Sequence, residues 1–265
     1  MNPSIKLWKK WQILIFITPL LLLILILKFV FNYLNFEIIS LNALFVSMLA
    51  ATTFLIGFLI TGVLSDYKES EKIPGDLACS LEAIYDEAYI LHRNKNTEVT
   101  AEFLEFYRGF LGSVLLWFHK KERTYSLMEK LGRMNDYFAQ FEPLTQANFI
   151  TRMKQEQTNV RKALTRVHTI RETTFIQSGY AVVESLAVFL IFGLLILKME
   201  PFFESLFIVS LASFFIIYML FLIRDLDNPF NYVNDGKEGN EVSLKPLNDL
   251  VKRVGRNDEA TIEKK

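Results

Sequence analysis

The sequence predicts an all-α membrane protein with four transmembrane helices and a cytosolic helical bundle inserted between spans 2 and 3. Three observations support this prediction. Hydrophobic residues make up 51% of the 265 residues, and they are concentrated in blocks instead of recurring periodically, as they would in a soluble domain. Four blocks approach the roughly 20 apolar residues that a spanning helix needs. No long run alternates between apolar and polar residues, so we expect no sheet.

The four apolar blocks contain almost no charge. They run from Trp11 to about Leu34, from Ile38 to Ser65, from Phe175 to Leu197, and from Ser205 to Ile223. The first contains only Lys28, near enough to its far end to snorkel towards water, and the third contains only Glu184. A basic segment precedes the first block, as in a signal peptide, but the apolar run is too long and no small-residue cleavage site follows it. We therefore expect a retained span.

The charges of the short loops predict the orientation. The N-terminal segment has three Lys and no acid, whereas the first connection holds only Lys28 and Glu37, and the last connection, KMEPFFE, has one Lys against two Glu. We therefore expect a multi-pass protein of the inner (cytoplasmic) membrane with both termini in the cytoplasm. The expected divisions are transmembrane helices 1 and 2 in residues 1–65, the cytosolic bundle in 66–174, transmembrane helices 3 and 4 in 175–223, and a cytosolic C-terminal tail in 224–265.

Apolar stripes predict the first two helices of the bundle. Pro74 suits the start of the first helix, because proline is favoured in a first helical turn. The stripe of this helix consists of Leu77, Leu81, Ile84 and Ala88. After the polar connection NKNTEV, a second helix is expected from about Thr100 to Lys120. Its apolar face consists of Phe103, Phe106, Phe110, Val114 and Trp117.

The third and fourth helices of the bundle follow from a proline and from a long stretch without helix breakers. The third covers about Tyr125 to Phe141 and stops before Pro143. The fourth begins near Leu144 and is expected to continue into the third span. It carries six basic residues: Arg152, Lys154, Arg161, Lys162, Arg166 and Arg171. Ringed in an oligomer they would form a cationic vestibule, but the more ordinary interpretation is a solvated face paired with acids such as Glu156 and Glu172. The final RNDEATIEKK is typical of a disordered tail.

Three short stretches resemble a known family. FLIGFLITGVLSDY, which begins at Phe54 and continues into charged residues without a turn, resembles the pore-helix stretch of bestrophins, where a Phe, a Gly-Phe pair and a downstream Thr recur at this spacing. LDNPF is similar to the bestrophin signature that follows the last span. VSLKPL at Val242–Leu247 resembles the tail of the bestrophin-like domain family of small bacterial membrane proteins. The residues of the post-span signature are Asp227, Asn228, Pro229 and Phe230.

Bestrophins are pentameric anion channels, so the resemblance implies a homopentamer in a lipid bilayer, with small inorganic anions passing along the five-fold axis. It places a hydrophobic neck on the second span at Ala50, Phe54 and Phe58, one helical turn apart. Ala50 departs from the family pattern, which has a bulky residue there, and this predicts a shorter constriction. On the same stretch, Gly57 and Thr61 are assigned to packing of the pore helices, because glycine lets neighbouring helices approach closely.

The chemistry of phenylalanine also supports a neck. Rings of Phe in a narrow pore disfavour a water column and can gate by dewetting, and their edges carry a partial positive charge that an anion tolerates. In a chain with 24 Phe, however, Phe54 and Phe58 could simply pack against other spans or lipid. The alternative function is then a non-conducting membrane sensor or scaffold that acts through its cytosolic helices.

Two acidic features bear on regulation. Animal bestrophins follow their signature with an acidic run that helps bind calcium, whereas Asp235 is the only acid in NYVNDG here. Calcium takes about six to eight oxygen ligands, so we expect no calcium site. Glu184 is the one acid inside a span and is therefore a candidate for transport or proton sensing. It could equally be hydrated at the interface or hydrogen-bond to Thr52, Thr53 or Tyr180.

Other functions are disfavoured by composition and spacing. The 29 basic and 29 acidic residues leave no basic surplus for a nucleic acid. His92, His119 and His168 fall on separate helices, and no phosphate-binding glycine loop or nucleophile elbow is present. The single cysteine, Cys79, excludes an intrachain disulfide and is expected to be a small buried residue. We therefore expect no enzyme, no metal and no cofactor.

Overall fold

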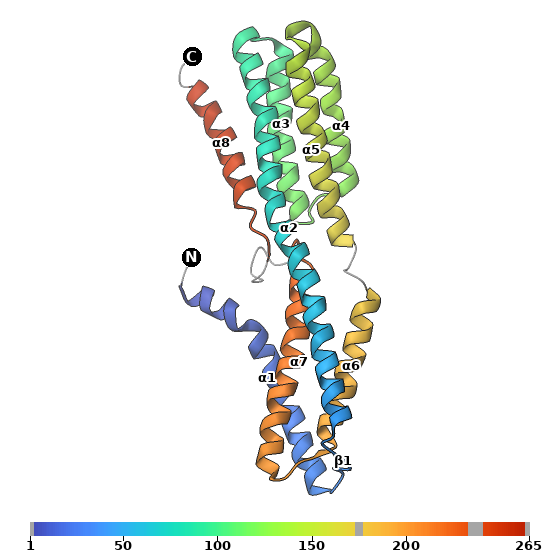
Figure 1. Cartoon of the computed structure of the whole chain (residues 1–265). Helices are drawn as coiled ribbons and strands as arrows, with labels where there is room; N and C mark the ends of the chain where they lie inside the picture. Colours follow the sequence, from blue (N-terminus) through green and yellow to red (C-terminus); the bar gives the residue numbers. More distant parts are fainter. Residues whose placement is uncertain (1–2, 173–176, 233–240, 263–265) are drawn as a thin grey trace. The chain divides into compact units, whose positions relative to one another are not determined.

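The computed structural model describes residues 3–172, 177–232 and 241–262, and these residues are almost entirely helical (Figure 1). The chain divides into two compact units. Unit 1 contains Met1–Tyr67 and Thr174–Asn228, and unit 2 contains Lys68–Thr173 and Pro229–Lys265. Within the described ranges, the only strands are β1 (Ile39–Ser40) and β2 (Leu197–Lys198). The predicted all-α class is confirmed for this part of the chain.

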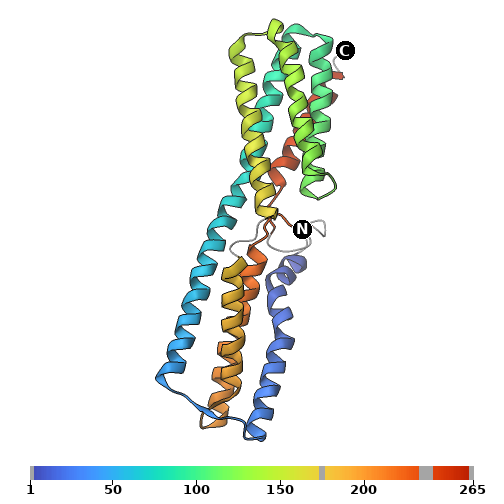
Figure 2. The same cartoon turned by 90° about the vertical axis from the view of Figure 1, so that its right-hand side faces the viewer.

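Unit 1 is built from α1 (Pro3–Tyr33), the first part of α2 (Ala43–Lys95), α6 (Gln177–Leu195) and α7 (Phe202–Leu226). In this unit α6 and α7 lie between α1 and α2 (Figure 2). Three described helices, α1, α2 and α7, are long and apolar enough to cross a membrane, and the described apolar part of α6 is shorter.

Two apolar clusters hold the helices of unit 1 together. In one of them the buried side of α2, represented by Ile56, Leu59 and Val63, packs against α6 and α7. In the other, Ile17 and Ile24 of α1 pack against residues of α6 and α7. α1 and α2 therefore each contribute to one cluster, whereas α6 and α7, which lie between them, contribute to both.

At one end of unit 1, Lys28 links the connection that follows α1 to the connection that follows α6. β1 and β2 pair in parallel, with Ile39 opposite Leu197. The prediction that Lys28 snorkels is wrong, because its side chain is fully buried. Its ammonium donates to the carbonyl oxygens of Leu194, Leu195 and Leu197, and it forms an ion pair with Glu37 at 2.7 Å. The last carbonyls of a helix have no intrahelical donor, and Lys28 supplies one to the end of α6.

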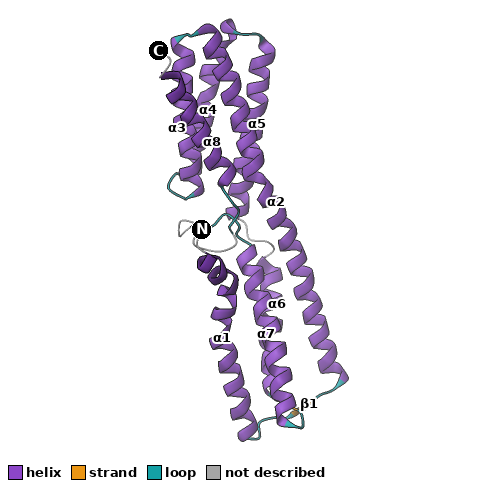
Figure 3. Cartoon of the chain, turned by 90° about the vertical axis from the view of Figure 1, so that its left-hand side faces the viewer, coloured by secondary structure: helices purple, strands orange, loops and turns teal. Residues whose placement is uncertain are grey.

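Unit 2 packs the second part of α2 against α3 (Glu98–Phe118), α4 (Thr124–Phe141), α5 (Ala147–Glu172) and α8 (Lys245–Ile262), with a short 3-10 turn, η1 (Glu142–Leu144), after α4. Figure 3 shows all of these segments as helix. The predicted stripe of the first bundle helix is confirmed, since all four of its residues are buried, and on α3 every predicted stripe residue except the half-buried Phe106 is buried. α4 ends just before Pro143, as predicted.

Three expectations for unit 2 are wrong. No helix begins at Pro74, because α2 runs through it without a break. Both flanks of Pro74 carry buried residues such as Ile73 and Leu77, and their packing outweighs the hydrogen bond that proline cannot donate. Cys79 is exposed, since it lies on the side of α2 opposite the buried stripe. The end of the chain is not a disordered tail as far as it is described, because α8 is helical to Ile262.

Two further expectations fall on residues whose structure is not described. The continuation of α5 into α6 depends on residues 173–176, which lie outside the described ranges. Asp235, on which the expected lack of a calcium site partly rested, lies in residues 233–240, which are also outside them.

Candidate functional site: an uncovered stripe of α2

The two sides of α2 within unit 1 differ sharply in exposure. Ile56, Leu59 and Val63 are buried, whereas Phe54 and Phe58, one helical turn apart, are each 72% exposed. Two large aromatic side chains therefore project from unit 1 without covering from the rest of the described chain. No other span of the described chain covers them, so they face lipid, another copy of the chain or an aqueous pore.

The residues that share this face of α2 form a stripe that continues in both directions along the helix. We call it the α2 stripe; it consists of Ser47, Ala50, Phe54, Phe58, Thr61 and Ser65, which recur every three or four positions and are all exposed. The Ser47 hydroxyl donates to the Ala43 carbonyl at 2.8 Å, and the Thr61 hydroxyl donates to the Gly57 carbonyl at 2.8 Å. Both hydroxyl groups are thus satisfied by the helix itself, and each oxygen keeps a lone pair towards the outside.

Gly57 lies at the margin of the α2 stripe. A Cβ atom built at this glycine would meet nothing within 4 Å. The glycine therefore does not serve close packing inside the described chain, and its role in packing of the pore helices stays a prediction. The exposed positions of α1 between Leu20 and Val30 are, in contrast, all large and apolar, which is typical of a surface that faces lipid.

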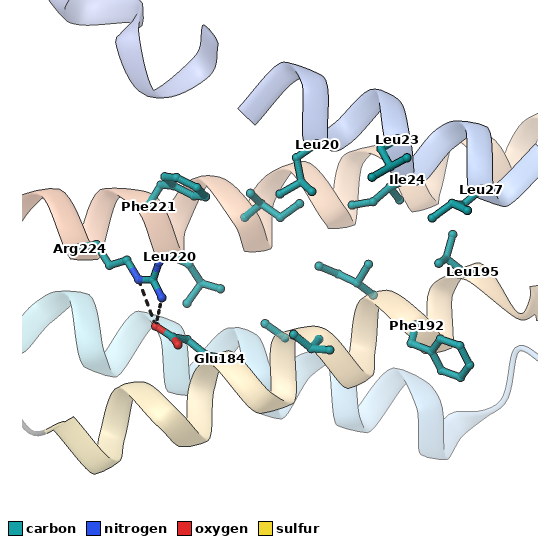
Figure 4. A pocket seen from close by; sticks show the side chains of 14 residues that line it. Leu20, Leu23, Ile24, Leu27, Glu184, Phe192, Leu195, Leu220, Phe221 and Arg224 are labelled. Carbon is teal, nitrogen blue, oxygen red and sulfur yellow. Dashed lines mark hydrogen bonds and ion pairs between the residues drawn. The ribbon is translucent and has the colours of Figure 1, made fainter. Parts of the chain in front are cut away.

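Glu184, the acid inside a span, pairs with Arg224 of α7 (Figure 4). Arg224 donates to one carboxylate oxygen of Glu184 through Nη2 at 2.7 Å and through Nε at 3.1 Å. The carboxylate is on α6 and lines a space between α1, α6 and α7, whereas the α2 stripe lies on α2. This partner differs from the expected Thr52, Thr53 and Tyr180, and it directly follows the expected end of the fourth span.

The Asn-Pro-Phe signature anchors the chain in unit 2. Asp227 closes α7 with its backbone N–H on the Ile223 carbonyl, and Asn228 is exposed. Pro229 is buried, and its carbonyl accepts from Val242 N–H at 3.0 Å. Phe230 is fully buried, with its ring centroid 6.0 Å from that of Phe118. These contacts assign the buried part of the signature to packing.

The end of α3, to which Phe230 docks, is also held by Arg171. Its guanidinium donates to the carbonyls of Trp117 and Phe118 at 3.2 and 2.8 Å and lies 4.5 Å from the centroid of the Trp117 ring. Burial lowers the pKa of Arg171 to about 10, which still leaves it charged at neutral pH. Arg171 thus acts as a structural cation that caps α3, and the expectation that it lies on a solvated face is wrong.

Other basic residues of α5 pair with acids of α2. Arg152 lies 2.8 Å from Glu87, and Arg166 binds both carboxylate oxygens of Glu69 at 3.1 Å. Glu156, one of the acids expected to pair with this face, accepts instead from Asn159. The interpretation of a charged face satisfied by neighbouring acids describes Arg152 and Arg166, but their partners lie on a different helix from the one expected.

Comparison with known proteins identifies the family. A family model for the bestrophin-like domain matches residues 13–232, which is most of the chain. The chain belongs to the bestrophin-like family. The match includes the α2 stripe, the Glu184–Arg224 pair and the Asn-Pro-Phe signature. The family suggested by three short stretches of sequence is therefore confirmed.

Solved structures of bacterial bestrophin homologues share the fold. A mutant of the homologue from Klebsiella pneumoniae has a TM-score of 0.71 at 14% identity, with 91% of this chain and 97% of that chain covered. Another structure of the Klebsiella pneumoniae homologue has a TM-score of 0.67 at 15% identity and covers 89% of this chain and 95% of that chain. Among curated proteins, none matches the chain. The similarity therefore extends over nearly the whole bestrophin-like fold.

Proposed function

We propose that this bestrophin-like protein is a homopentameric, anion-conducting channel of the inner membrane, with its neck formed by Ala50, Phe54 and Phe58 of the α2 stripe. In this proposal α1, α2, α6 and α7 span the membrane, and unit 2 and both termini lie in the cytoplasm. The pentamer and the anion follow from the resemblance to bestrophins. The loop charges support the orientation, and the apolar lengths of the helices support the embedding.

One observation carries the proposal: Phe54 and Phe58 are exposed on the side of α2 that faces away from the unit 1 core. Small and hydroxyl-bearing residues flank these two phenylalanines on the same face. A surface facing only lipid has no need of Ser47, Thr61 and Ser65, whereas a pore lining gains polar groups that water can hydrogen-bond. The pattern therefore favours a pore lining over a lipid contact.

The mechanism follows from the positions along α2. Phe54 and Phe58 are four residues apart, so five copies of each would form two rings separated by about 6 Å along the axis. Such rings oppose a continuous water column in a narrow pore, while their edges tolerate an anion. At the outer end, the small side chain of Ala50 would leave the pore wider than at the two phenylalanine rings, so the constriction is one ring shorter. Thr61 would border the pore at the inner end, where its hydroxyl oxygen can accept a hydrogen bond from water.

The Glu184–Arg224 pair removes an objection to an anion channel. An unpaired carboxylate inside the membrane would repel anions, but Arg224 supplies the compensating charge at 2.7 Å. The pair is on α6 and α7, and neither residue belongs to the α2 stripe. We therefore expect that the Glu184 carboxylate does not hinder the passage of anions.

Cysteine accessibility tests whether the α2 stripe faces water. In a Cys79→Ser background, Phe54→Cys and Phe58→Cys would be treated with a water-soluble anionic thiol reagent in reconstituted vesicles. Phe189→Cys is the matched control, because Phe189 of α6 is 71% exposed on another surface of unit 1. We expect the two α2 cysteines to react at least about tenfold faster than the control, since the thiolate forms only where water reaches it. Equal, slow reaction at all three positions would contradict a pore at this stripe.

A further inference from the structure

A cavity of about 480 Å³ lies between α1, α6 and α7 in unit 1 (Figure 4). This volume falls within the roughly 300–1,000 Å³ of pockets that bind small molecules. Twelve of the fourteen lining residues are apolar, and the other two are Glu184 and Arg224. Along α6 the lining extends from Glu184 to Leu195, about 16 Å at the helical rise per residue. The cavity is thus long and apolar, with its charge confined to two residues.

The cavity opens on the surface of unit 1. Leu23 of α1 and Val188 and Phe192 of α6 line it, yet more than half of each side chain is exposed. This part of a bestrophin-like protein is embedded in the membrane, so an opening of this kind meets lipid tails. An apolar cavity that water cannot favourably fill is expected to hold a hydrocarbon chain.

The charged pair has free capacity for a ligand. Both hydrogen bonds between Arg224 and Glu184 end on the same carboxylate oxygen, Oε1, and they use only Nε and Nη2 of the guanidinium. The side chains are 61% and 36% exposed, respectively, so a ligand can reach them. The second carboxylate oxygen can accept a hydrogen bond and the remaining guanidinium nitrogen can donate one while the pair stays intact.

We propose that this cavity binds a zwitterionic phospholipid, with one acyl chain along α6, the phosphate at Arg224 and the head-group ammonium at Glu184. Arg224 lies two residues from the end of α7, so the polar end of the site is at the end of a membrane helix, where a head group resides. A second copy of the chain is a less suitable occupant, because an apolar helix would cover the second Glu184 oxygen and the remaining Arg224 nitrogen without hydrogen-bonding to either. The site is separate from the proposed neck and does not depend on conduction.

Photolabelling of the full-length protein in vesicles tests the acyl-chain part. The probe is phosphatidylethanolamine with a diazirine in its acyl chain, and the labelled residues are found by mass spectrometry. We expect labels on the cavity residues of α1, α6 and α7 at several times the level found on Leu44 and Val46 of α2, which are also exposed apolar residues. Even labelling of every exposed apolar residue, or no labelling in the cavity, would overturn the proposal.

A pair of variants on one helix controls for local disturbance. Val188→Trp places a large ring in the cavity, whereas Val182→Trp places the same ring on an exposed part of α6 that does not line it. We expect labelling of the cavity to fall severalfold in the first variant and to stay unchanged in the second. Oligomer mass measured on the same samples checks assembly. Equal labelling in both variants would contradict binding inside the cavity.

Competition among unlabelled lipids tests the head-group part. We expect phosphatidylethanolamine to compete better than phosphatidylglycerol, which lacks the ammonium, and both to compete better than diacylglycerol, which lacks the phosphate. Arg224→Gln is expected to weaken the advantage of phospholipids over diacylglycerol by about tenfold, the loss typical of one hydrogen bond to a charged group. Glu184→Gln should abolish the preference for the ethanolamine head group alone. Equal competition by all three lipids would show that the ion pair recognises no head group.

Discussion

Lys28 lies within the apolar block of α1, and yet its ammonium is fully buried among carbonyl oxygens and the Glu37 carboxylate. Its partners on α6 and β2 are more than 160 positions away in the sequence, so the sequence could locate the charge but not its use. Arg224 is a similar case, since it looks like an ordinary cation at the end of a helix until α6 brings Glu184 beside it. Long-range polar partners of this kind have no local signature.

Lys28→Met tests the role of the buried ammonium. The substitution leaves Glu37 buried without its cation and the carbonyls at the end of α6 without a donor, and we expect it to cost about 3–5 kcal/mol of stability. Thermal unfolding of the purified protein would measure the loss. Lys198→Met is the matched control at the same end of unit 1, because the ion pair of Lys198 with Glu200 is largely exposed and should contribute little. Equal melting temperatures for Lys28→Met and wild type would contradict this account.

At the scale of the elements, helical periodicity predicts which faces are buried, whereas composition alone misses one helix. The stripe from Leu77 to Ala88 and the aromatic face of α3 could be predicted, because buried residues recur at the helical period. α8 was missed because polar residues outnumber its apolar ones, although Leu247, Leu250 and Val254 already form a stripe that is buried in unit 2. Pro74 misled because local propensity is weaker than tertiary packing.

Phe230→Ala tests whether the Asn-Pro-Phe signature anchors the segment after α7 in unit 2. Removing a fully buried ring that contacts Phe118 leaves a cavity, so we expect a loss of about 3–5 kcal/mol. Hydrogen exchange should become faster at the end of α3 and in α8, which packs on α3. Tyr125→Ala, at an exposed aromatic residue of α4, serves as the control. Unchanged exchange in the Phe230 variant would mean that the signature has another role.

At the scale of the whole molecule, the resemblance predicts an oligomer and the loop charges predict an orientation in the membrane, and neither is a property of a single chain. Membership of the family could be predicted from motifs in the right order. Covering of the α2 stripe could not be predicted, because it depends on other copies of the chain or on lipid. Gly57 likewise has no neighbour within 4 Å of a Cβ position in a single chain.

The orientation in the membrane can be measured with a reporter at the C-terminus. The N-terminal segment is basic, whereas the two short loops between the spans are poor in basic residues. We therefore expect both ends of the chain in the cytoplasm. A reporter fused after Lys265 should be active only if it is one that functions in the cytoplasm. Activity of a reporter that functions only outside the membrane would reverse the topology and remove unit 2 from the cytoplasm.

Ion flux through Phe54→Ala/Phe58→Ala is the most direct test of the central proposal. If the two phenylalanines form stacked rings in an oligomer, the double substitution removes the dewetting barrier to ion passage. Chloride flux in reconstituted vesicles should then rise, by about tenfold for each 1.4 kcal/mol by which the barrier is lowered. Oligomer mass, measured on the same sample, should stay at five subunits. Phe189→Ala, at an equally exposed phenylalanine of α6, should leave the flux unchanged. An intact oligomer with the same negligible flux in wild type and in the double variant would contradict the channel.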